Sequence, residues 1–288
     1  MALPILTLLL ALAPAAAEEA YRTEIQKLRD EQEAKLRAED GWLTVVGLFW
    51  LKRGPNRFGA DPSNEIVLPS GSGPARAGVF DFDGARVTVR AEPGVPITVN
   101  GRAVSSLLLR ADTPDSPDRV VLGDLSLQVL RRGARYGIRL RDKNSRQRRE
   151  FTGRRWFPVQ PAYRVIARFV LYQLPKILAI PNVLGESDEQ PSPGYAVFTL
   201  GGKEHRLEPV SYEPGELFFI FKDRTAGRET YPAGRFLYTG LPRDGRLVLD
   251  FNQAVSPPCA FTDFATCPLP PRQNHLAVQI PAGERKHH

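Results

Sequence analysis

The sequence predicts a mainly β protein with an N-terminal helix, a β-sandwich and then a second, smaller sheet or half-barrel. Short runs of apolar residues recur from about residue 64 onward, each bounded by Gly, Pro or Asp. The 288 residues include 24 Gly and 26 Pro, which suit many tight turns between short strands. A helical pattern, with apolar residues three or four positions apart, precedes Gly41.

Residues 1–17 are typical of a signal peptide. They carry no charged side chain, contain an apolar run and end in Ala15-Ala16-Ala17 before Glu18. No later apolar run reaches the roughly 18 residues that a membrane-spanning helix needs. We therefore expect a soluble protein that is exported to the periplasm or secreted, without membrane insertion.

Residues 18–40 predict one amphipathic helix. Tyr21, Ile25, Leu28 and Leu36 recur at nearly helical spacing among alternating acidic and basic residues. Gly41 is expected to end the helix. Because acids and bases are balanced on the polar face, the apolar stripe is expected to pack on the body of the protein and not on a membrane.

Residues 41–174 predict a β-sandwich domain. An aromatic-rich segment over 41–51 is followed by short β runs at 66–68, 78–82, 85–91, 97–99, 120–122, 125–130 and 136–140. A Pro-rich and acidic segment over 175–193 is expected to be a linker. Residues 194–288 then predict a smaller β domain, with strands at 195–200, 217–221, 235–239, 247–251 and 276–280.

The positive charge is concentrated in one segment. The chain carries a formal charge of +7, whereas residues 131–155 alone carry +9 from 11 Lys or Arg and two acids. This segment lacks the regular aromatic residues of a base-stacking surface, so no nucleic-acid partner is expected. It is read as a solvated basic hairpin, or alternatively as the binding face for an anionic partner.

The familiar catalytic and cofactor motifs are absent from the sequence. There is no Gly-x-Ser-x-Gly elbow, phosphate-binding loop, dinucleotide-binding glycine motif or His-Glu-x-x-His metal site. His205 could act as a general base, but a surface position beside a turn is the favoured interpretation. No cofactor and no metal site are expected, and the sequence does not decide whether the protein is an enzyme.

Part of the sandwich region, residues 58–130, resembles a forkhead-associated domain. The similarity rests on Phe58-Gly-Ala-Asp-Pro-Ser-Asn-Glu-Ile-Val-Leu68, Val99-Asn-Gly-Arg102 and Leu122-Gly-Asp-Leu-Ser-Leu-Gln-Val129. In that family an Arg after the first Gly and a Ser-x-x-His motif serve the phosphothreonine site. Ala60 replaces the Arg here, and residues 72–75 contain no His. The resemblance therefore implies the sandwich and argues against phosphopeptide binding.

Three further segments resemble the bacterial and archaeal family catalogued as domain of unknown function 1684. They are Gly41-Trp-Leu-x-x-x-Gly-Leu-Phe-Trp-Leu51, Phe221-x-Asp-x-Thr-x-Gly-x-Glu-Thr-Tyr-x-x-Gly-Arg235, and Leu249-Asp-Phe-Asn-x-Ala continuing to Pro257-Pro-Cys-Ala-Phe-Thr262 and Cys267-Pro-Leu-Pro-Pro271. Val255-Ser256 stand where Tyr-Asn is expected. The resemblance spans nearly all of the chain after the signal peptide and brings no established activity with it.

The candidate site residues lie in the C-terminal domain. Asp223, Glu229 and Asp250 are candidate catalytic carboxylates, because two carboxylates that share a site acquire different pKa values and can serve as acid and base. The candidate ligand-binding residues are Thr225, Tyr231, Arg235, Asn252 and Asn274. In the structural alternative, Asp223 caps a turn and Arg235 pairs with Glu229.

Asp250 and Asn252 are expected to share one face of a strand, since side chains alternate with period two. Together they could bind a sugar hydroxyl or hold a water. Equally, they could form a buried polar network that fixes the loop at Pro257-Pro258.

Cys259 and Cys267 are the only cysteines and are expected to form a disulfide in an oxidising compartment. A zinc site built from these two cysteines and His275 is the lesser alternative, because it lacks a fourth ligand.

These patterns favour an exported protein that binds a small polar or anionic ligand, a glycan or an envelope metabolite, in a pocket of the C-terminal domain. One alternative is a cofactor-free hydrolase that uses the paired carboxylates. Another is a structural or partner-binding envelope protein that uses the basic face. The oligomeric state cannot be derived from the sequence.

Overall fold

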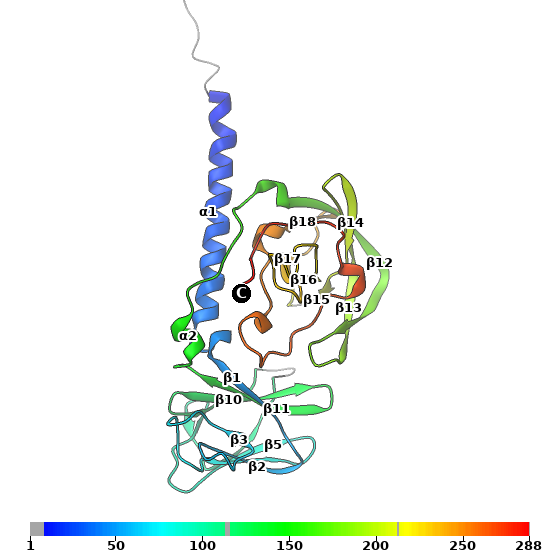
Figure 1. Cartoon of the computed structure of the whole chain (residues 1–288). Helices are drawn as coiled ribbons and strands as arrows, with labels where there is room; N and C mark the ends of the chain where they lie inside the picture. Colours follow the sequence, from blue (N-terminus) through cyan, green and yellow to red (C-terminus); the bar gives the residue numbers. More distant parts are fainter. Residues whose placement is uncertain (1–8, 113–115, 212, 288) are drawn as a thin grey trace, which may run out of the picture. The chain divides into compact units, whose positions relative to one another are not determined.

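The computed structural model describes residues 9–112, 116–211 and 213–287, which fold into two compact units (Figure 1). Unit 1 comprises Met1–Lys35, Thr152–Ala260 and Thr266–His288, and unit 2 comprises Leu36–Phe151 and Phe261–Ala265. The protein is mainly β with an N-terminal helix, as the sequence predicted.

Unit 2 is a sandwich of two sheets. The first has the order β1 (Val45–Trp50), β11 (Arg135–Asp142), β10 (Leu125–Arg132), β9 (Val120–Leu122), β6 (Thr98–Val99), β7 (Arg102–Ala103). The second has the order β3 (Ile66–Val67), β2 (Gly54–Gly59), β4 (Gly78–Phe82), β5 (Val87–Ala91), β8 (Ser106–Leu109). A 3-10 turn (Trp42–Thr44) precedes β1, and the short helix α2 (Arg146–Glu150) follows β11.

One apolar core lies between these two sheets. Alternate residues of each strand enter it, such as Phe80 from β4 and Leu127 and Ile138 from the facing sheet. Phe58 of β2 contacts Phe80 with ring centroids 4.8 Å apart. The sandwich that the period-two pattern predicted is therefore present.

The basic segment 131–155 is not a uniformly solvated hairpin. Its first half forms the β10–β11 turn, but Arg139 and Arg141 are only 7% and 9% exposed. Their guanidinium groups lie 4.8 and 5.6 Å from the ring centroid of Trp42, a cation–π arrangement. Burial lowers the pKa of Arg141 to about 10. Arg154 belongs to unit 1 and forms a buried ion pair with Glu284.

Unit 1 begins with helix α1 (Leu9–Arg37). The helix extends across part of the predicted signal peptide, of which residues 1–8 lie outside the described residues, and ends before the predicted Gly41. Ile25 is fully buried, as the helical stripe predicted. No helix within the described ranges is both long enough and apolar enough to cross a membrane.

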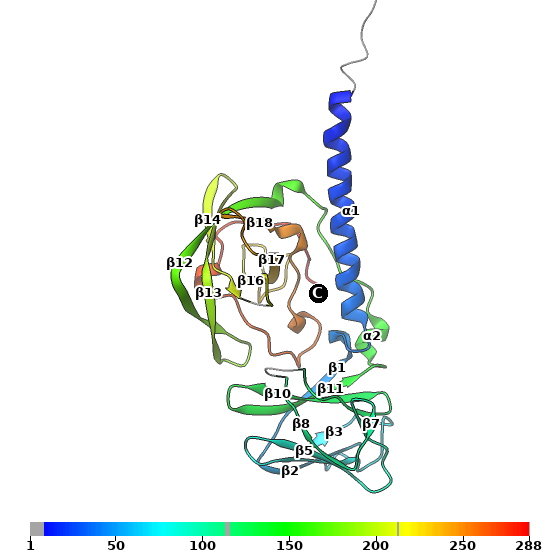
Figure 2. The same cartoon turned by 180° about the vertical axis from the view of Figure 1, so that it is seen from behind.

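The strands of unit 1 form a curled half-barrel. In Figures 1 and 2 a long hairpin curves around the shorter strands beside it. One sheet has the order β14 (Lys203–Leu207), β13 (Ser187–Leu200), β12 (Arg164–Pro181), β18 (Arg246–Asp250). The other has the order β15 (Val210–Ser211), β16 (Glu216–Phe221), β17 (Arg235–Gly240). The irregular parts include four 3-10 turns, at Pro161–Tyr163, Phe251–Gln253, Pro258–Ala260 and Arg272–Asn274.

Strand β16 is buried on both faces. Phe219 and Phe221 enter the core of unit 1 together with Phe198 of β13 and Leu249 of β18. The alternate residues of β16 point to the opposite face and are also buried. This continuous apolar run is typical of a central strand. One face of β16 packs in the core of unit 1, and the other face packs against different residues on the outer side.

The domain boundaries differ from those predicted. Residues 175–193, expected to be a linker, lie in the hairpin of β12 and β13, where Ile177 pairs with Pro191. Unit 2 ends at Phe151 rather than at 174, and it also includes 261–265. The expected strand at 276–280 is not formed. Those residues run as irregular backbone, and the N–H of Ile280 donates to the carboxylate of Asp223 instead of to a neighbouring strand.

Replacing Gly194 of β13 with alanine is expected to destabilise unit 1. The added Cβ would lie 2.2 Å from the carbonyl oxygen of Val170 on the paired strand, so the hairpin must separate. We expect a loss of about 1–3 kcal/mol in the free energy of unfolding, measured by urea denaturation. Gly240→Ala is the matched control, because no atom lies within 4 Å of its new Cβ. Equal stability of the two variants would contradict this packing.

Candidate functional site

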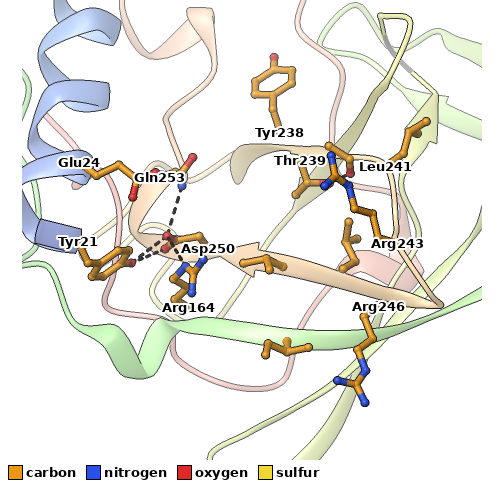
Figure 3. Close-up of a pocket in the computed structure, with 14 residues that line it drawn as sticks. Tyr21, Glu24, Arg164, Tyr238, Thr239, Leu241, Arg243, Arg246, Asp250 and Gln253 are labelled. Carbon is orange, nitrogen blue, oxygen red and sulfur yellow. Dashed lines mark hydrogen bonds and ion pairs between the residues drawn. The ribbon is translucent and has the colours of Figure 1, made fainter. Parts of the chain in front are cut away.

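A cavity of about 500 Å³ opens in unit 1 between α1, β12 and the β17–β18 hairpin (Figure 3). Its volume lies within the range of small-molecule sites. The lining residues come from three separate stretches of chain and combine charged, hydroxyl and apolar groups: Tyr21, Glu24, Arg164, Ile166, Tyr238, Thr239, Gly240, Leu241, Arg243, Arg246, Leu247, Val248, Asp250 and Gln253.

The carboxylate of Asp250, at the end of β18, organises one wall of this cavity. The Tyr21 hydroxyl of α1 donates to it, lying 2.9 and 2.8 Å from its two oxygens. Both the backbone N–H and the side-chain amide of Asn252 donate to Oδ1 at 3.1 Å. Gln253 Nε2 donates to Oδ2 at 3.3 Å, and Arg164 Nε lies 3.9 Å from that oxygen. A buried carboxylate is stable here because its lone pairs are occupied.

The environment of Tyr21 keeps its hydroxyl protonated. Burial, together with the hydrogen bond and the negative charge of Asp250, raises the pKa of Tyr21 above its usual range. The phenol is therefore a hydrogen-bond donor at neutral pH and not a nucleophile.

Asn252 does not continue β18, as the period-two prediction assumed. The strand ends at Asp250, whose side chain caps the 3-10 turn Phe251–Gln253. Asn252 Oδ1 accepts from the Gln160 backbone N–H at 3.0 Å, and its amide donates to the Gln160 carbonyl at 2.9 Å. This arrangement is a buried polar network, which was the predicted alternative. The network joins α1 and residue 160 to β18, whereas the prediction had it fix the loop at Pro257-Pro258.

Arg29 holds the same part of α1 on unit 1. It is 5% exposed, and its two terminal nitrogens donate to the carbonyls of Phe157 at 3.1 Å and Asn252 at 3.2 Å. The guanidinium lies 4.7 Å from the ring centroid of Trp156. Burial lowers the pKa of Arg29. The helix is thus docked by Tyr21 and Arg29, two turns apart on one face.

Two arginines reach the cavity from opposite ends. Arg164 lies beside Asp250, and its side chain is 52% exposed. Arg243 and Thr239 both line the cavity, and in Figure 3 the Arg246 side chain points away from Arg243. Since Asp250 already balances Arg164, Arg243 supplies a positive charge near the Thr239 hydroxyl.

The predicted site residue Asp223 lies outside this cavity and is buried. Its carboxylate forms an ion pair with Arg235 at 3.1 Å, in which both side chains are 1% exposed. It also accepts from Thr225 Oγ1 and from the backbone N–H of Ile280 at 2.7 Å. Arg235 donates in addition to the carbonyls of Ile280 and Ala282. The pair fastens the irregular C-terminal segment to β17 and is not open to a substrate.

The remaining candidates are separated from Asp250. Arg235 pairs with Asp223 and not with Glu229, so the predicted alternative pairing is wrong. Tyr231 donates its hydroxyl proton to the Cys259 carbonyl at 2.8 Å. Asn274 is buried, donates to the carbonyls of Glu208 and Ile220, and accepts from the Glu208 N–H. The hydrogen bonds of Tyr231 and Asn274 hold loops in place.

The predicted disulfide between Cys259 and Cys267 is not formed in the structure. The backbone N–H of Cys259 donates to Sγ of Cys267 at 3.2 Å. A hydrogen bond with the second thiol lowers the pKa of Cys259. Among the described residues, no group of three His, Cys, Asp or Glu side chains is arranged to hold a metal ion.

Sequence reasoning found Asp250 but missed the groups that surround it. Tyr21 was assigned only to the apolar stripe of a helix, and Arg164, Thr239 and Arg243 were not singled out. Tyr21 lies 229 residues from Asp250. No local pattern could connect them, although the polar hydroxyl of Tyr21 within an apolar stripe was a usable signal.

Comparison with known proteins places the chain in a family. The sequence profile described as "Protein of unknown function (DUF1684)" matches residues 149–285. An uncharacterised protein of Haloarcula marismortui, solved by NMR, is 32% identical; the match covers 49% of this chain and 81% of that one, with a TM-score of 0.42. The chain belongs to the DUF1684 family. No curated protein matches its sequence significantly.

Forkhead-associated domains also match, with lower identity. The FHA-2 domain of a Mycobacterium tuberculosis ABC transporter is 22% identical, covering 33% of this chain and 80% of that one, with a TM-score of 0.26. EmbR of the same organism, solved in complex with a low-affinity phosphopeptide, is 16% identical, covering 32% of this chain and 21% of EmbR, with a TM-score of 0.23.

Removing the Tyr21 hydroxyl is expected to weaken the docking of α1 in a pH-dependent way. Tyr21→Phe should lower the free energy of unfolding by about 1–2 kcal/mol at pH 7, the contribution of a hydrogen bond to a charged acceptor. The folded pKa of Tyr21 lies above the unfolded value of about 10, so its stabilisation is complete below that pH and is lost as the pH rises further. The difference between wild type and variant should therefore shrink above pH ~10.

Urea denaturation between pH 7 and pH 11, followed by circular dichroism, measures this difference. Tyr195→Phe is the control, because it removes a hydroxyl from an aromatic residue of the same unit outside the cavity. If both variants gave the same stability profile, Tyr21 would not be the residue that docks the helix.

Asp223→Asn is expected to destabilise unit 1 by about 3–5 kcal/mol, because it leaves the Arg235 guanidinium buried without a carboxylate. Thermal and urea unfolding measure the effect. Asp244→Asn is the control, since Asp244 is exposed and asparagine tolerates its positive φ of 49°. An unchanged unfolding midpoint for Asp223→Asn would contradict a structural role for the pair.

Proposed function

We propose that the protein binds a small hydroxylated molecule with one anionic group in the cavity bounded by Tyr21, Asp250 and Arg243. The observation that carries this proposal is that one open cavity of about 500 Å³ has two ends lined by different polar groups. One end holds the exposed side chains of Arg164 and Glu24 beside the Tyr21–Asp250 pair, and the other is lined by Arg243 and Thr239 (Figure 3). A sugar phosphate or a uronate has matching chemistry, with hydroxyls for the first end and an anion for the second.

The apolar side chains between these ends support the same class of ligand. Ile166, Leu241 and Val248 line the cavity and are 66%, 55% and 39% exposed. Such residues contact the C–H faces of a ring, while a few polar groups fix its orientation. Residues 1–17 resemble a signal peptide, and we accordingly propose that the ligand is met in the periplasm or outside the cell.

Binding is favoured over the alternative of hydrolysis. The carboxylates predicted to act with Asp250 do not line the cavity: Asp223 is buried in an ion pair, and Glu229 is not among the lining residues. The second carboxyl group at the cavity is that of Glu24, which is exposed on α1. The oxygens of Asp250 are occupied by donors from three side chains. The basic-face alternative is also less favoured, because Arg139, Arg141 and Arg154 are buried among protein groups.

Arg243→Gln is expected to weaken binding of glucose 6-phosphate, a representative sugar phosphate, by roughly tenfold or more, the cost of losing a charged hydrogen bond. Isothermal titration calorimetry on the folded full chain measures the affinity, with glucose and inorganic phosphate as partial probes. Arg243 is exposed, so folding should be unaffected. Arg228→Gln, an exposed arginine outside the cavity, is the matched control. Equal affinities for wild type and Arg243→Gln would remove the proposed anion site.

A further inference from the structure

A second cavity, of about 230 Å³, lies in unit 1 where the β12–β13 hairpin meets β15 and β16. It shares no lining residue with the first cavity. Five of its lining residues are apolar and four are polar: Ile180, Val210, Phe218, Ile220 and Pro268, with Asp188, Gln190, Ser211 and Thr266. Such an apolar volume with a few polar groups has the composition of a ligand site.

The floor of this second cavity follows from the alternation along β16. Phe219 and Phe221 point into the core of unit 1, so Phe218 and Ile220 point to the outer side and line the cavity. Phe218 is held in place by its cross-strand partner Tyr238, with parallel rings and centroids 4.7 Å apart. A second ring, that of Phe236, is nearly perpendicular to it, with the ring centroids 4.8 Å apart. This aromatic floor is preformed and presents a flat apolar surface.

The polar groups of this second cavity include a single charge. Asp188 is the one ionisable side chain among its nine lining residues, and it is exposed. Gln190 follows on the same face of β13, whereas Glu189 between them points to the opposite face. No arginine or lysine lines the cavity. The charge at its rim is therefore complementary to a cation.

The volume limits the size of the occupant. An apolar cavity of about 150 Å³ accommodates benzene, so about 230 Å³ accommodates one aromatic ring with a short side chain. We propose that this second cavity binds a small arylalkylamine, with the ring on Phe218 and Ile220 and the protonated amine at Asp188. This site shares no lining residue with the proposed sugar-binding cavity and takes a ligand of opposite charge.

Three molecules of nearly equal size test the proposal on the full chain: 2-phenylethylamine, 2-phenylethanol and phenylacetate. Ligand-observed NMR titrations give their relative affinities. We expect the amine to bind roughly two- to fivefold more tightly than the alcohol, the range of a partly exposed ion pair, and phenylacetate to bind most weakly. Asp188→Asn should remove the preference for the amine and leave the affinity for the alcohol unchanged.

Two further variants complete the test. Ser211→Phe places a ring in the cavity from an exposed position on β15, and it should abolish binding of all three molecules. Glu189→Gln removes a neighbouring charge that does not line the cavity and should preserve the preference for the amine. Circular dichroism confirms that each variant is folded. The proposal is overturned if none of the molecules binds, if Ser211→Phe leaves binding intact, or if Glu189→Gln has the same effect as Asp188→Asn.

Discussion

The arrangement of unit 1 depends on the need to satisfy one buried carboxylate. Asp250 is 4% exposed at the end of β18, where an ionised group without partners would be strongly destabilising. Tyr21, Asn252 and Gln253 supply the donors. Because one donor comes from α1, the same requirement that stabilises Asp250 fixes the helix on the half-barrel. It also gives the larger cavity a polar wall whose groups already have defined orientations.

The fold was predictable where the pattern of side chains was regular. The runs at 78–82 and 125–130 coincide with β4 and with most of β10, because one face of each strand packs in a core. The hairpin of β12 and β13 was mistaken for a linker because of its prolines. Pro175 lies at the irregular interval in the β12–β13 register, where a missing N–H costs little.

The candidate site was only partly predictable, for a different reason. The sequence drew attention to Asp223, Arg235, Asp250 and Asn252 because polar residues interrupt apolar strands there. It could not reveal which of these residues would line a cavity, since all four are buried. Asp223 and Arg235 neutralise one another inside the protein, whereas Asp250 reaches a cavity wall. Burial of a charged group is a tertiary property, and so is the pairing of Tyr21 with a residue 229 positions later.

The division of the chain between the two units has a consequence for its synthesis. Helix α1 is made first, and then the whole of residues 36–151 emerges before the half-barrel that receives the helix. At translation rates of about 5–20 residues per second, the 229 residues between Tyr21 and Asp250 take roughly ten to fifty seconds. During that interval the nascent helix has no docking surface, and Ile25 must stay exposed or be held by a chaperone. The sandwich, in contrast, receives all but five of its residues early and can fold before the half-barrel is complete.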